Sequence, residues 1–315
     1  MNRITIVLLG VIFSLIVLIV TIQNDKLRCS SLGSKIVDNI LNIEAGTMKC
    51  EKLYYTGVLK NPDSESISFI KEKDYSESIR FNNISSKIEL DCPTNSDIIV
   101  IIGQSNSANH GLSKIIESNK DLNFFNNNCY SLSEPVLGAT AKSHSLTSSL
   151  SSKIKNKKPI IFLTNGWGGT SIKEWSIHGS VLTTYANENI KELVKNNNLK
   201  YVIWIQGESD KNNSGINYIK HFENFKKQLF ESINPEKLKD LKIIVTQTSI
   251  CGYYDTSAQH IVSQQKKLGE IYSNVIVTNV SDNLDLNFRH DGCHFNVLGI
   301  ERITDEISEI INKGY

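Results

Sequence analysis

The sequence lacks an excess of charge of either sign. Its 34 Lys and Arg residues are balanced by 33 Asp and Glu residues, which leaves a formal net charge of +1, and the basic residues form no stripe. Proteins that bind nucleic acid usually gather Lys and Arg on one face to neutralise phosphates. The charge balance therefore argues against nucleic acid as a partner.

The sequence also lacks the spacings that mark bound metals and phosphates. No two of its six cysteines stand in Cys-x-x-Cys spacing, and no internal repeat occurs. No glycine-rich stretch ends in the Gly-Lys-Ser/Thr of a phosphate-binding loop. We therefore expect neither a metal nor a cofactor.

A long hydrophobic run occurs at the amino terminus. Residues 4–22 carry no charge, and about 20 apolar residues are enough to span a bilayer as a helix. No Ala-x-Ala-like cleavage site follows, which favours an uncleaved transmembrane signal anchor over residues 1–24 rather than a cleaved signal. Positive charges on the two sides nearly tie, so they do not set the orientation. The even cysteine count after an export-type segment permits disulfides, and we expect a membrane-anchored, extracytoplasmic protein.

Residues 25–94 carry no usable signature and are expected to form an accessory or stalk region, whereas the pattern over residues 95–315 is regular. Strand-like runs recur at Ile98–Ile102, Ile160–Thr164, Tyr201–Ile205, Ile243–Thr248 and Val275–Val280. Helix-like segments lie at Ser145–Ile154, Ala186–Val194, Tyr218–Ile233, Ala258–Ile271 and Val297–Ile311. This alternation predicts a three-layer α/β/α sandwich with a central, mainly parallel sheet.

In such a sandwich the loops that follow the strands share one rim, where ligands bind. Cys251 and Cys293 both lie in loops of this kind and are the expected disulfide pair. The alternative is six unrelated thiols, several of them buried as small hydrophobic residues.

The first strand leads into a candidate nucleophile. Ile98 to Ile102 is an unbroken run of branched aliphatic residues, which suits a strand covered on both faces. Gly103 lets the chain turn sharply, and Ser105 then stands just beyond the strand's carboxyl end. An ordinary strand-to-helix turn is the alternative, because glycine, serine and asparagine are common turn residues.

The loop after the second strand is rich in glycine and reads Asn165-Gly-Trp-Gly-Gly-Thr-Ser-Ile-Lys-Glu-Trp175. Its backbone N–H groups are candidates for an oxyanion hole, although a flexible glycine turn is the simpler interpretation. Trp167 and Trp175 either form a wall on which a sugar stacks or pack in the core.

The loop after the third strand reads Trp204-Ile-Gln-Gly-Glu-Ser-Asp210. Gln206 can donate an amide N–H, and Glu208 and Asp210 can accept hydrogen bonds that brace neighbouring loops. Two carboxylates so close in one loop are poorly placed for glycoside hydrolysis, which needs them on opposite sides of a sugar bond.

The last loop, just before the final helix, offers a base. His294 is the candidate, and Asp291 can fold back to fix its tautomer. His290 competes for the role because it also adjoins Asp291. A zinc site made of His290, Asp291, Cys293 and His294 is a crowded alternative. The remaining histidines are expected to be structural: His110, His144, His178, His221 and His260.

Together the four loops resemble the SGNH hydrolase superfamily, whose fold is flavodoxin-like, and within it the sialate O-acetylesterase-like, carbohydrate acetylesterase branch. The resemblance covers residues 97–313. It rests on Gly103-Gln-Ser-Asn106, Gly168-Gly-Thr-Ser-Ile-Lys-Glu-Trp175, Trp204-Ile-Gln-Gly-Glu-Ser-Asp210 and Asp291-Gly-Cys-His-Phe295. It implies that Ser105 is the nucleophile, His294 the base and Asp291 the residue that orients the base.

The resemblance also implies an oxyanion hole. Its donors would be the backbone N–H groups of Ser105 and Gly169 and the side chain of Gln206, with Gly168 as the alternative to Gly169. Gln206 stands where the superfamily has asparagine, which leaves the geometry of the third donor open. Supporting roles fall to Gln104, Asn106 and Glu208.

The activity implied is serine-dependent removal of acetyl groups from a sugar or an envelope polysaccharide, through an acetyl-enzyme. An O-acetyltransferase would use the same residues and pass the acetyl group to a sugar hydroxyl instead of water. A non-catalytic carbohydrate-binding protein is the other alternative, and the complete set of Ser105, Asp291 and His294 argues against it.

Overall fold

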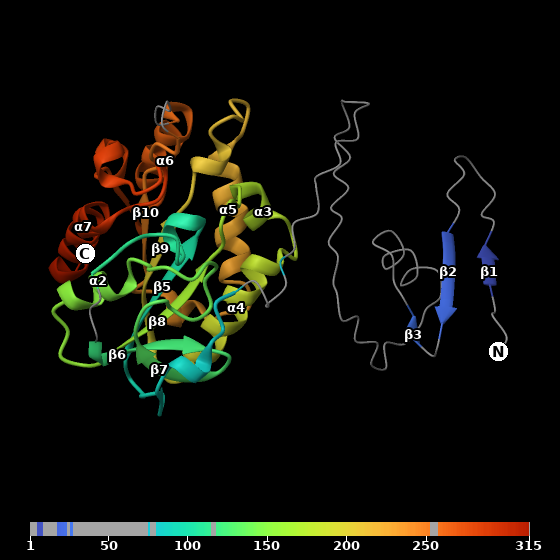
Figure 1. Ribbon diagram of the computed structural model, residues 1–315, viewed down its shortest axis with the longest axis horizontal. Coiled ribbons are helices and arrows are strands. Elements are labelled where there is room, and N and C mark those ends of the chain that lie inside the picture. Colours follow the sequence, from blue (N-terminus) through green and yellow to red (C-terminus); the bar gives the residue numbers. More distant parts are fainter. Residues whose placement is uncertain are drawn as a thin grey trace. The chain divides into compact units, whose positions relative to one another are not determined.

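The computed structural model describes residues 5–8, 18–23, 26–27, 75, 80–114, 118–252 and 258–314 (Figure 1). Contacts divide the chain into two compact units, Met1–Ser76 and Glu77–Tyr315. In the first unit, β1 (Thr5–Leu8), β2 (Leu18–Gln23) and β3 (Lys26–Leu27) form an antiparallel sheet in that order.

The transmembrane helix expected over residues 1–24 is not observed and stays a prediction, because β1 and β2 are the only parts of that segment that the structure describes. None of the described helices has both the length and the apolar character needed to cross a bilayer. Of the accessory region expected over residues 25–94, residues 80–94 belong to the second unit. There β4 (Glu89–Leu90) adds a strand to the main sheet.

The second unit is built on an eight-stranded sheet with the order β11-β10-β9-β5-β8-β6-β7-β4. Its remaining strands are β5 (Asp97–Gly103), β6 (Ser118–Phe125), β7 (Asn128–Leu132), β8 (Ile160–Gly166), β9 (Asn198–Ile205), β10 (Lys242–Thr246) and β11 (Val275–Thr278). All pairings from β11 to β6 are parallel, whereas β7 and β4 are antiparallel to their neighbours. The sheet is therefore mainly parallel, as predicted.

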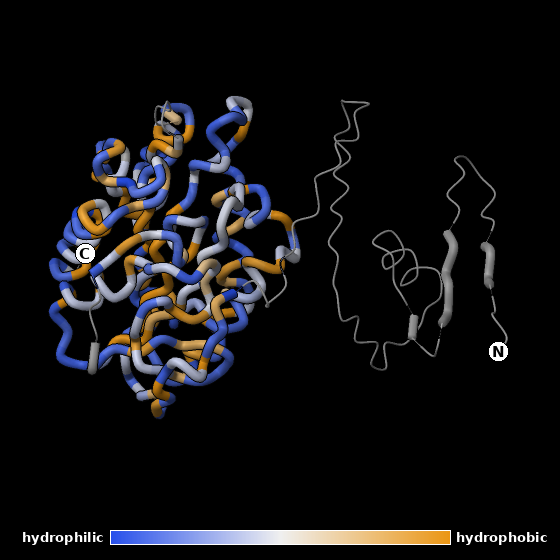
Figure 2. The backbone as a smooth tube through the Cα atoms, in the orientation of Figure 1, coloured by the Kyte–Doolittle hydropathy of each residue, from blue (hydrophilic) through white to orange (hydrophobic). Residues whose placement is uncertain are grey.

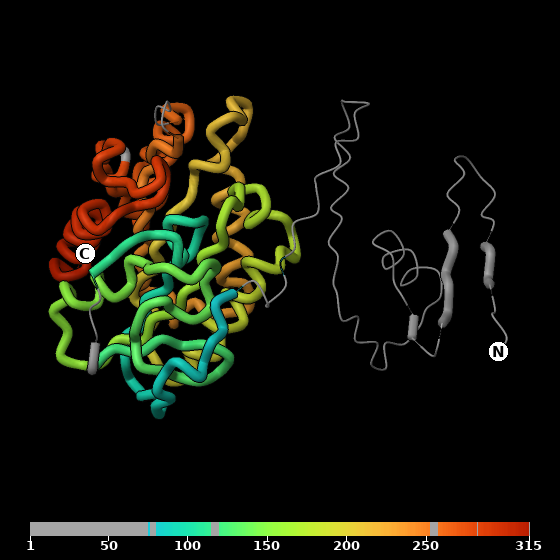
Figure 3. Tube along the Cα trace, in the orientation of Figure 1, coloured from blue at the N-terminus to red at the C-terminus, as the bar shows by residue number. Residues whose placement is uncertain are grey.

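Helices cover both faces of this sheet. On one face α2 (Thr147–Lys153) packs on α7 (Val297–Lys313), although the two are far apart in sequence (Figure 3). The other layer contains α3 (Ile172–Ser176), α4 (Val181–Leu193), α5 (Tyr218–Leu229) and α6 (Gln259–Ile271), which contact one another in turn. The three-layer α/β/α sandwich is confirmed.

The core lies along the central strands, where hydrophobic residues concentrate (Figure 2). Every residue from Ile98 to Ile102 in β5 is at most 1% exposed, which explains why the run has no polar position. On α5 the predicted apolar face is buried at Tyr218, Phe222, Phe225 and Leu229. Because β5 is paired on both sides, by β8 and β9, its carboxyl end is held at the middle of the rim.

The hairpin of β6 and β7 is the main element that the sequence did not predict. β6 carries polar residues into the interior: Asp121 accepts hydrogen bonds from the Ser151 hydroxyl (2.6 Å) and the Ile160 N–H (2.9 Å). The turn between the strands has positive φ at Asn126 and Asn127, 49° and 65°. An Asn-Asn pair at such a turn is a hairpin signal, and it was the feature that could have revealed these strands.

Candidate active site

The turn that carries Ser105 depends on glycine. Gly103 ends β5 with φ of +140°, and a Cβ there would lie 2.1 Å from the Ile205 carbonyl oxygen in β9. The Gln104 N–H donates to that same carbonyl at 2.9 Å. Ser105 then opens the 3₁₀ turn η3 (Ser105–Ser107) and is 4% exposed. The serine thus stands at the carboxyl end of the central strand, as the sequence predicts.

The loop before α7 holds the candidate base, His294, beside Asp291. Asp291 Oδ2 lies 2.6 Å from His294 Nδ1, while Oδ1 accepts the backbone N–H groups of Cys293 (3.0 Å) and His294 (2.8 Å). Burial, the largest single influence, raises the pKa of Asp291, but these hydrogen bonds together lower it to about 2. The carboxylate is therefore ionised at neutral pH, so Nδ1 carries the proton and Nε2 presents a lone pair.

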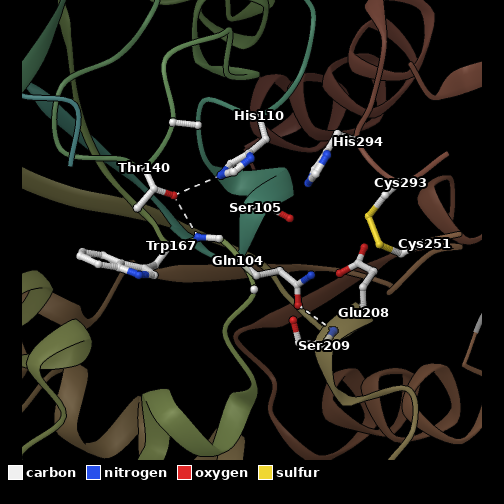
Figure 4. Close-up of a pocket in the computed structure, with 13 residues that line it drawn as sticks. Gln104, Ser105, His110, Thr140, Trp167, Glu208, Ser209, Cys251, Cys293 and His294 are labelled. Carbon is white, nitrogen blue, oxygen red and sulfur yellow. Dashed lines mark hydrogen bonds between the residues drawn. A yellow bond between two sulfur atoms is a disulfide. The ribbon is translucent and has the colours of Figure 1, made fainter. Parts of the chain in front are cut away.

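Ser105 and His294 share one cavity of about 650 Å³, although they are far apart in the sequence (Figure 4). Their side chains face a common space in that view. The lining residues are Gln104, Ser105, His110, Thr140, Ala141, Trp167, Gly168, Gly169, Glu208, Ser209, Cys251, Cys293 and His294. Asp291 is outside this lining and supports His294 from behind, so the predicted trio comes together.

Gln104 and Gln206 form a brace behind the nucleophile turn. Gln104 Oε1 accepts from Gln206 Nε2 (3.3 Å) and from the backbone N–H groups of Gly207 (3.2 Å) and Ser209 (3.1 Å). Gln206 Nε2 also donates to Asp210 Oδ2 (2.6 Å) and the Thr170 carbonyl (3.1 Å). Gln206 is 1% exposed and does not line the cavity. The structure therefore does not bring its amide together with Ser105.

Glu208 and Asn106 join the nucleophile turn to the histidine loop. Glu208 Oε1 accepts from Asn106 Nδ2 (3.3 Å) and the Ser249 hydroxyl (2.8 Å). Asn106 Oδ1 in turn accepts the Phe295 N–H at 3.4 Å. Both residues therefore brace the neighbouring loops, and their supporting role in the site stays a prediction.

The glycine loop after β8 forms another wall. The Gly168 N–H donates to Thr140 Oγ1 at 2.9 Å, so this group is already used within the protein. A Cβ at Gly169 would meet nothing within 4 Å, so that position faces open space. Trp167 lines the cavity, whereas Trp175 is fully buried and donates to Thr170 Oγ1 at 2.9 Å. Neither tryptophan offers a free face for a sugar, because Trp175 packs in the core and Trp167 is 4% exposed, with the Arg80 guanidinium 4.7 Å from its ring centroid.

The histidines near the site separate into distinct roles. His290 Nε2 lies 2.8 Å from the His110 carbonyl, which can only accept, so this nitrogen carries a proton and cannot take one from Ser105. His290, Asp291 and His294 offer ligand atoms within 4.8 Å of one another, but these groups already hydrogen-bond to the protein. The fourth residue of the zinc alternative, Cys293, is in a disulfide.

The sequence did not predict that His110 lies at the candidate site. It was expected to be structural, yet it lines the cavity beside His294. Thr140 was likewise not singled out. The one available signal for His110 was its closeness in sequence to Ser105, and Thr140 had none.

Comparison with known proteins identifies the family. A family model described as "Carbohydrate esterase, sialic acid-specific acetylesterase" matches residues 95–311, more than half of the chain. The chain belongs to this carbohydrate esterase family. The fold is similar to a protein from Arabidopsis thaliana that is 22% identical, with a TM-score of 0.56 and coverage of 69% of this chain and 98% of that one. It is also similar to NanS, at 14% identity and a TM-score of 0.52, covering 70% and 98%. No curated protein matches the chain in sequence.

Two disulfides cross-link the part of the esterase that the structure describes. Cys251–Cys293 is the predicted pair, and both of its cysteines line the cavity. It ties the loop after β10 to the residue next to His294, and the Gly252 N–H adds a bond to the Gly292 carbonyl at 2.9 Å. Cys92–Cys129 joins the segment before β5 to β7, and neither of its cysteines lines the cavity.

Removing the two disulfides separately should have different effects on turnover. The bridges close similar lengths of chain, with separations of 42 and 37 residues, so each loss should cost about 4 kcal/mol of stability in the chain-entropy model. Cys251→Ala/Cys293→Ala should also lower kcat by about 10²-fold, because it releases the loop that positions His294. Cys92→Ala/Cys129→Ala is the matched control and should retain kcat. Equal kcat in the two double variants, below their melting temperatures, would contradict this role.

The acid stability of the esterase should depend on Asp291. Its folded pKa of about 2 lies below the usual value of about 3.9, so it contributes stability above pH 4 that is lost as the pH falls toward 2. The side chain is 43% exposed, and solvent screening keeps this contribution modest. In Asp291→Asn, the melting temperature should fall less steeply between pH 4 and 2 than in the wild type. A slope identical to the wild type in circular dichroism would show that Asp291 contributes nothing there.

Proposed function

We propose that this family member is a serine esterase that removes acetyl groups from a carbohydrate through an acetyl-enzyme. The observation that carries the proposal is that His294, which shares a cavity with Ser105, is held by Asp291 through a 2.6 Å hydrogen bond. An ionised carboxylate on Nδ1 gives the base the tautomer that this chemistry requires.

The reaction follows from those positions. His294 Nε2 takes the hydroxyl proton of Ser105 while Oγ attacks the ester carbonyl, and the tetrahedral intermediate collapses as His294 returns the proton to the departing sugar oxygen. Water, activated by the same nitrogen, then attacks the acetyl-enzyme and releases acetate. Asp291 stabilises the imidazolium formed in each half-reaction.

The oxyanion donors are the backbone N–H groups of Ser105 and Gly169. The choice of Gly169 follows the resemblance, and the N–H of its alternative, Gly168, donates to Thr140 Oγ1 at 2.9 Å. The resemblance assigns a third donor to Gln206, but three acceptors already surround the two hydrogens of its amide. We propose that Gln206 acts mainly by holding Gln104 and Asp210, and that the two backbone donors carry the charge.

The experiment that tests this function measures acetate release by the full-length protein. Substrates are p-nitrophenyl acetate, an O-acetylated sialic acid and an acetylated neutral polysaccharide, each with and without an unacetylated glycan. We expect free acetate and labelling of Ser105 by a serine-reactive phosphonate. Acetyl transfer to the added glycan would identify an O-acetyltransferase instead. Folded protein that is neither labelled nor active would favour a carbohydrate-binding protein.

We also propose that the esterase domain is extracytoplasmic and held at a membrane by residues 1–24. Disulfides persist in oxidising compartments, and two cross-link this domain. Thiol trapping during isolation, combined with protease treatment of intact cells, tests the proposal. Free cysteines at all four positions, in a domain protected from the protease, would refute it.

A further inference from the structure

His110 lies directly against the candidate base. Its ring stacks on that of His294, with centroids 4.9 Å apart and an interplanar angle of 24°. Figure 4 shows the two rings side by side at the edge of the cavity, with Ser105 below them. His110 comes from the segment that follows η3, so the stack joins the nucleophile side of the site to the histidine loop.

Contacts at its ring, its carbonyl and its neighbours hold His110 in place. Its Nε2 lies 3.3 Å from Thr140 Oγ1, and its carbonyl accepts from His290 Nε2 at 2.8 Å. A Cβ at residue 168 would lie 2.9 Å from His110 Nε2, so the ring fits because that residue is Gly168. The next residues are fixed as well, since the Leu112 N–H donates to the Phe295 carbonyl at 2.9 Å. The ring is therefore a fixed surface.

The base needs such a surface. The 2.6 Å bond from Asp291 holds one ring atom of His294, Nδ1, but a single hydrogen bond does not fix the plane of the imidazole. Rotation about that bond would swing Nε2 away from Ser105. Stacking against a fixed ring removes this rotational freedom. A stacked aromatic pair also stabilises the structure by more than the burial of its surface area alone would.

The charge of His110 suits this position. Burial has the largest influence on the pKa of His110 and lowers it, as do the neighbouring His294 and, more weakly, His290. Asp291 raises it, and the resulting pKa is about 4. At neutral pH the ring is uncharged and does not oppose the positive charge that His294 acquires when it takes the serine proton.

We propose that His110 is a positioning residue whose ring fixes the plane of the His294 imidazole, and that Thr140 ties this ring to the glycine loop. Thr140 Oγ1 contacts both His110 Nε2 (3.3 Å) and the Gly168 N–H (2.9 Å), so one hydroxyl joins the ring that packs on His294 to the glycine loop. This inference rests on the proposed function, because it assigns the purpose of the stack to proton transfer at His294.

Three variants of the full-length protein separate the ring from its hydrogen bond. His110→Ala removes both and should lower kcat for p-nitrophenyl acetate about 10- to 100-fold with little change in KM. His110→Phe keeps a flat ring without the bond to Thr140 and should stay within about threefold of the wild type. His110→Leu keeps bulk without a flat face and should behave like His110→Ala. If His110→Ala fails to fold, the test is the comparison of kcat between His110→Phe and His110→Leu.

A second readout does not require activity. The Nδ1 proton of His294 in its short bond to Asp291 should give a low-field proton resonance, which we expect to be lost or broadened in His110→Ala and restored in His110→Phe. His221→Ala is the matched control: His221 also contacts a hydroxyl, Ser176 Oγ at 2.7 Å, but lies on α5 outside the cavity lining. It should change neither the resonance nor kcat.

The outcomes are distinct. Wild-type kcat in His110→Ala, or equal losses in the Phe and Leu variants, would overturn the proposal. Wild-type protein without esterase activity would refute the proposed function. If the wild type is inactive, the resonance alone tests the positioning role. A His294 resonance that is unchanged in His110→Ala would refute that role, whereas loss of the resonance in His110→Ala would support the conclusion that the stack orients His294.

Discussion

Ser105→Ala should lower turnover by about 10⁶-fold, the scale on which removal of the nucleophile acts in serine hydrolases. In the proposed reaction only the Ser105 oxygen can form the acetyl-enzyme. Its hydroxyl makes no hydrogen bond with the described part of the protein, so its loss should change the free energy of unfolding by no more than about 0.5 kcal/mol. Acetate release and the melting temperature would be measured on the same preparation.

The matched control for this variant lies in the same turn. Ser107→Ala removes a hydroxyl that donates to the Gln104 carbonyl at 2.6 Å. It should cost about 1 kcal/mol of stability and leave turnover within about tenfold of the wild type. Loss of turnover in Ser107→Ala alone, with Ser105→Ala active, would remove Ser105 from the mechanism.

Asp291→Asn should reduce kcat by about 10⁴-fold, although the side chain keeps its shape. An amide that donates to His294 Nδ1 forces the proton onto Nε2, which then cannot accept the proton of Ser105. The loss should appear in kcat more than in KM, because Asp291 lies outside the cavity lining. Steady-state kinetics at neutral pH would measure it.

A neighbouring aspartate provides the control. Asp285 Oδ1 accepts the Asn287 N–H at 2.9 Å and starts the short helix η7 (Leu286–Phe288), a role that asparagine also fills. Asp285→Asn should keep turnover within about twofold. If Asp291→Asn matched it, proton transfer at His294 would not depend on Asp291.

The sequence predicted the parts of the fold that depend on uninterrupted apolar character. β5 and β8 to β11 are short apolar runs, and the amphipathic α5, between β9 and β10, and α7, after β11, take the expected places in the order. It did not predict β6, whose one signal was the Asn126-Asn127 turn, because that strand is stabilised by polar contacts. Asn123 Oδ1, for example, accepts the Leu137 N–H at 2.6 Å, a partner that exists only after folding.

The candidate site also contains residues that the sequence marks and residues that only tertiary packing places. Ser105, Asp291 and His294 could be singled out as candidates because turn chemistry and short motifs mark them, and the cavity brings Ser105 and His294 together. The position of Gln206 could not be read from the sequence, since it is set by Asp210 and by Tyr218, whose hydroxyl donates to Gln206 Oε1 at 2.9 Å. His110 is a similar case, because only tertiary packing stacks it on His294.

The cross-link between Cys251 and Cys293 also bears on when the enzyme begins to work. Cys293 is the immediate neighbour of His294, so the bond that clamps the base forms only where thiols are oxidised. If the domain is exported as proposed, a newly made chain on the reducing side of the membrane would hold every reacting group yet leave its base loosely held. Export would then act as the maturation step, and acetyl esters inside the cell would be spared.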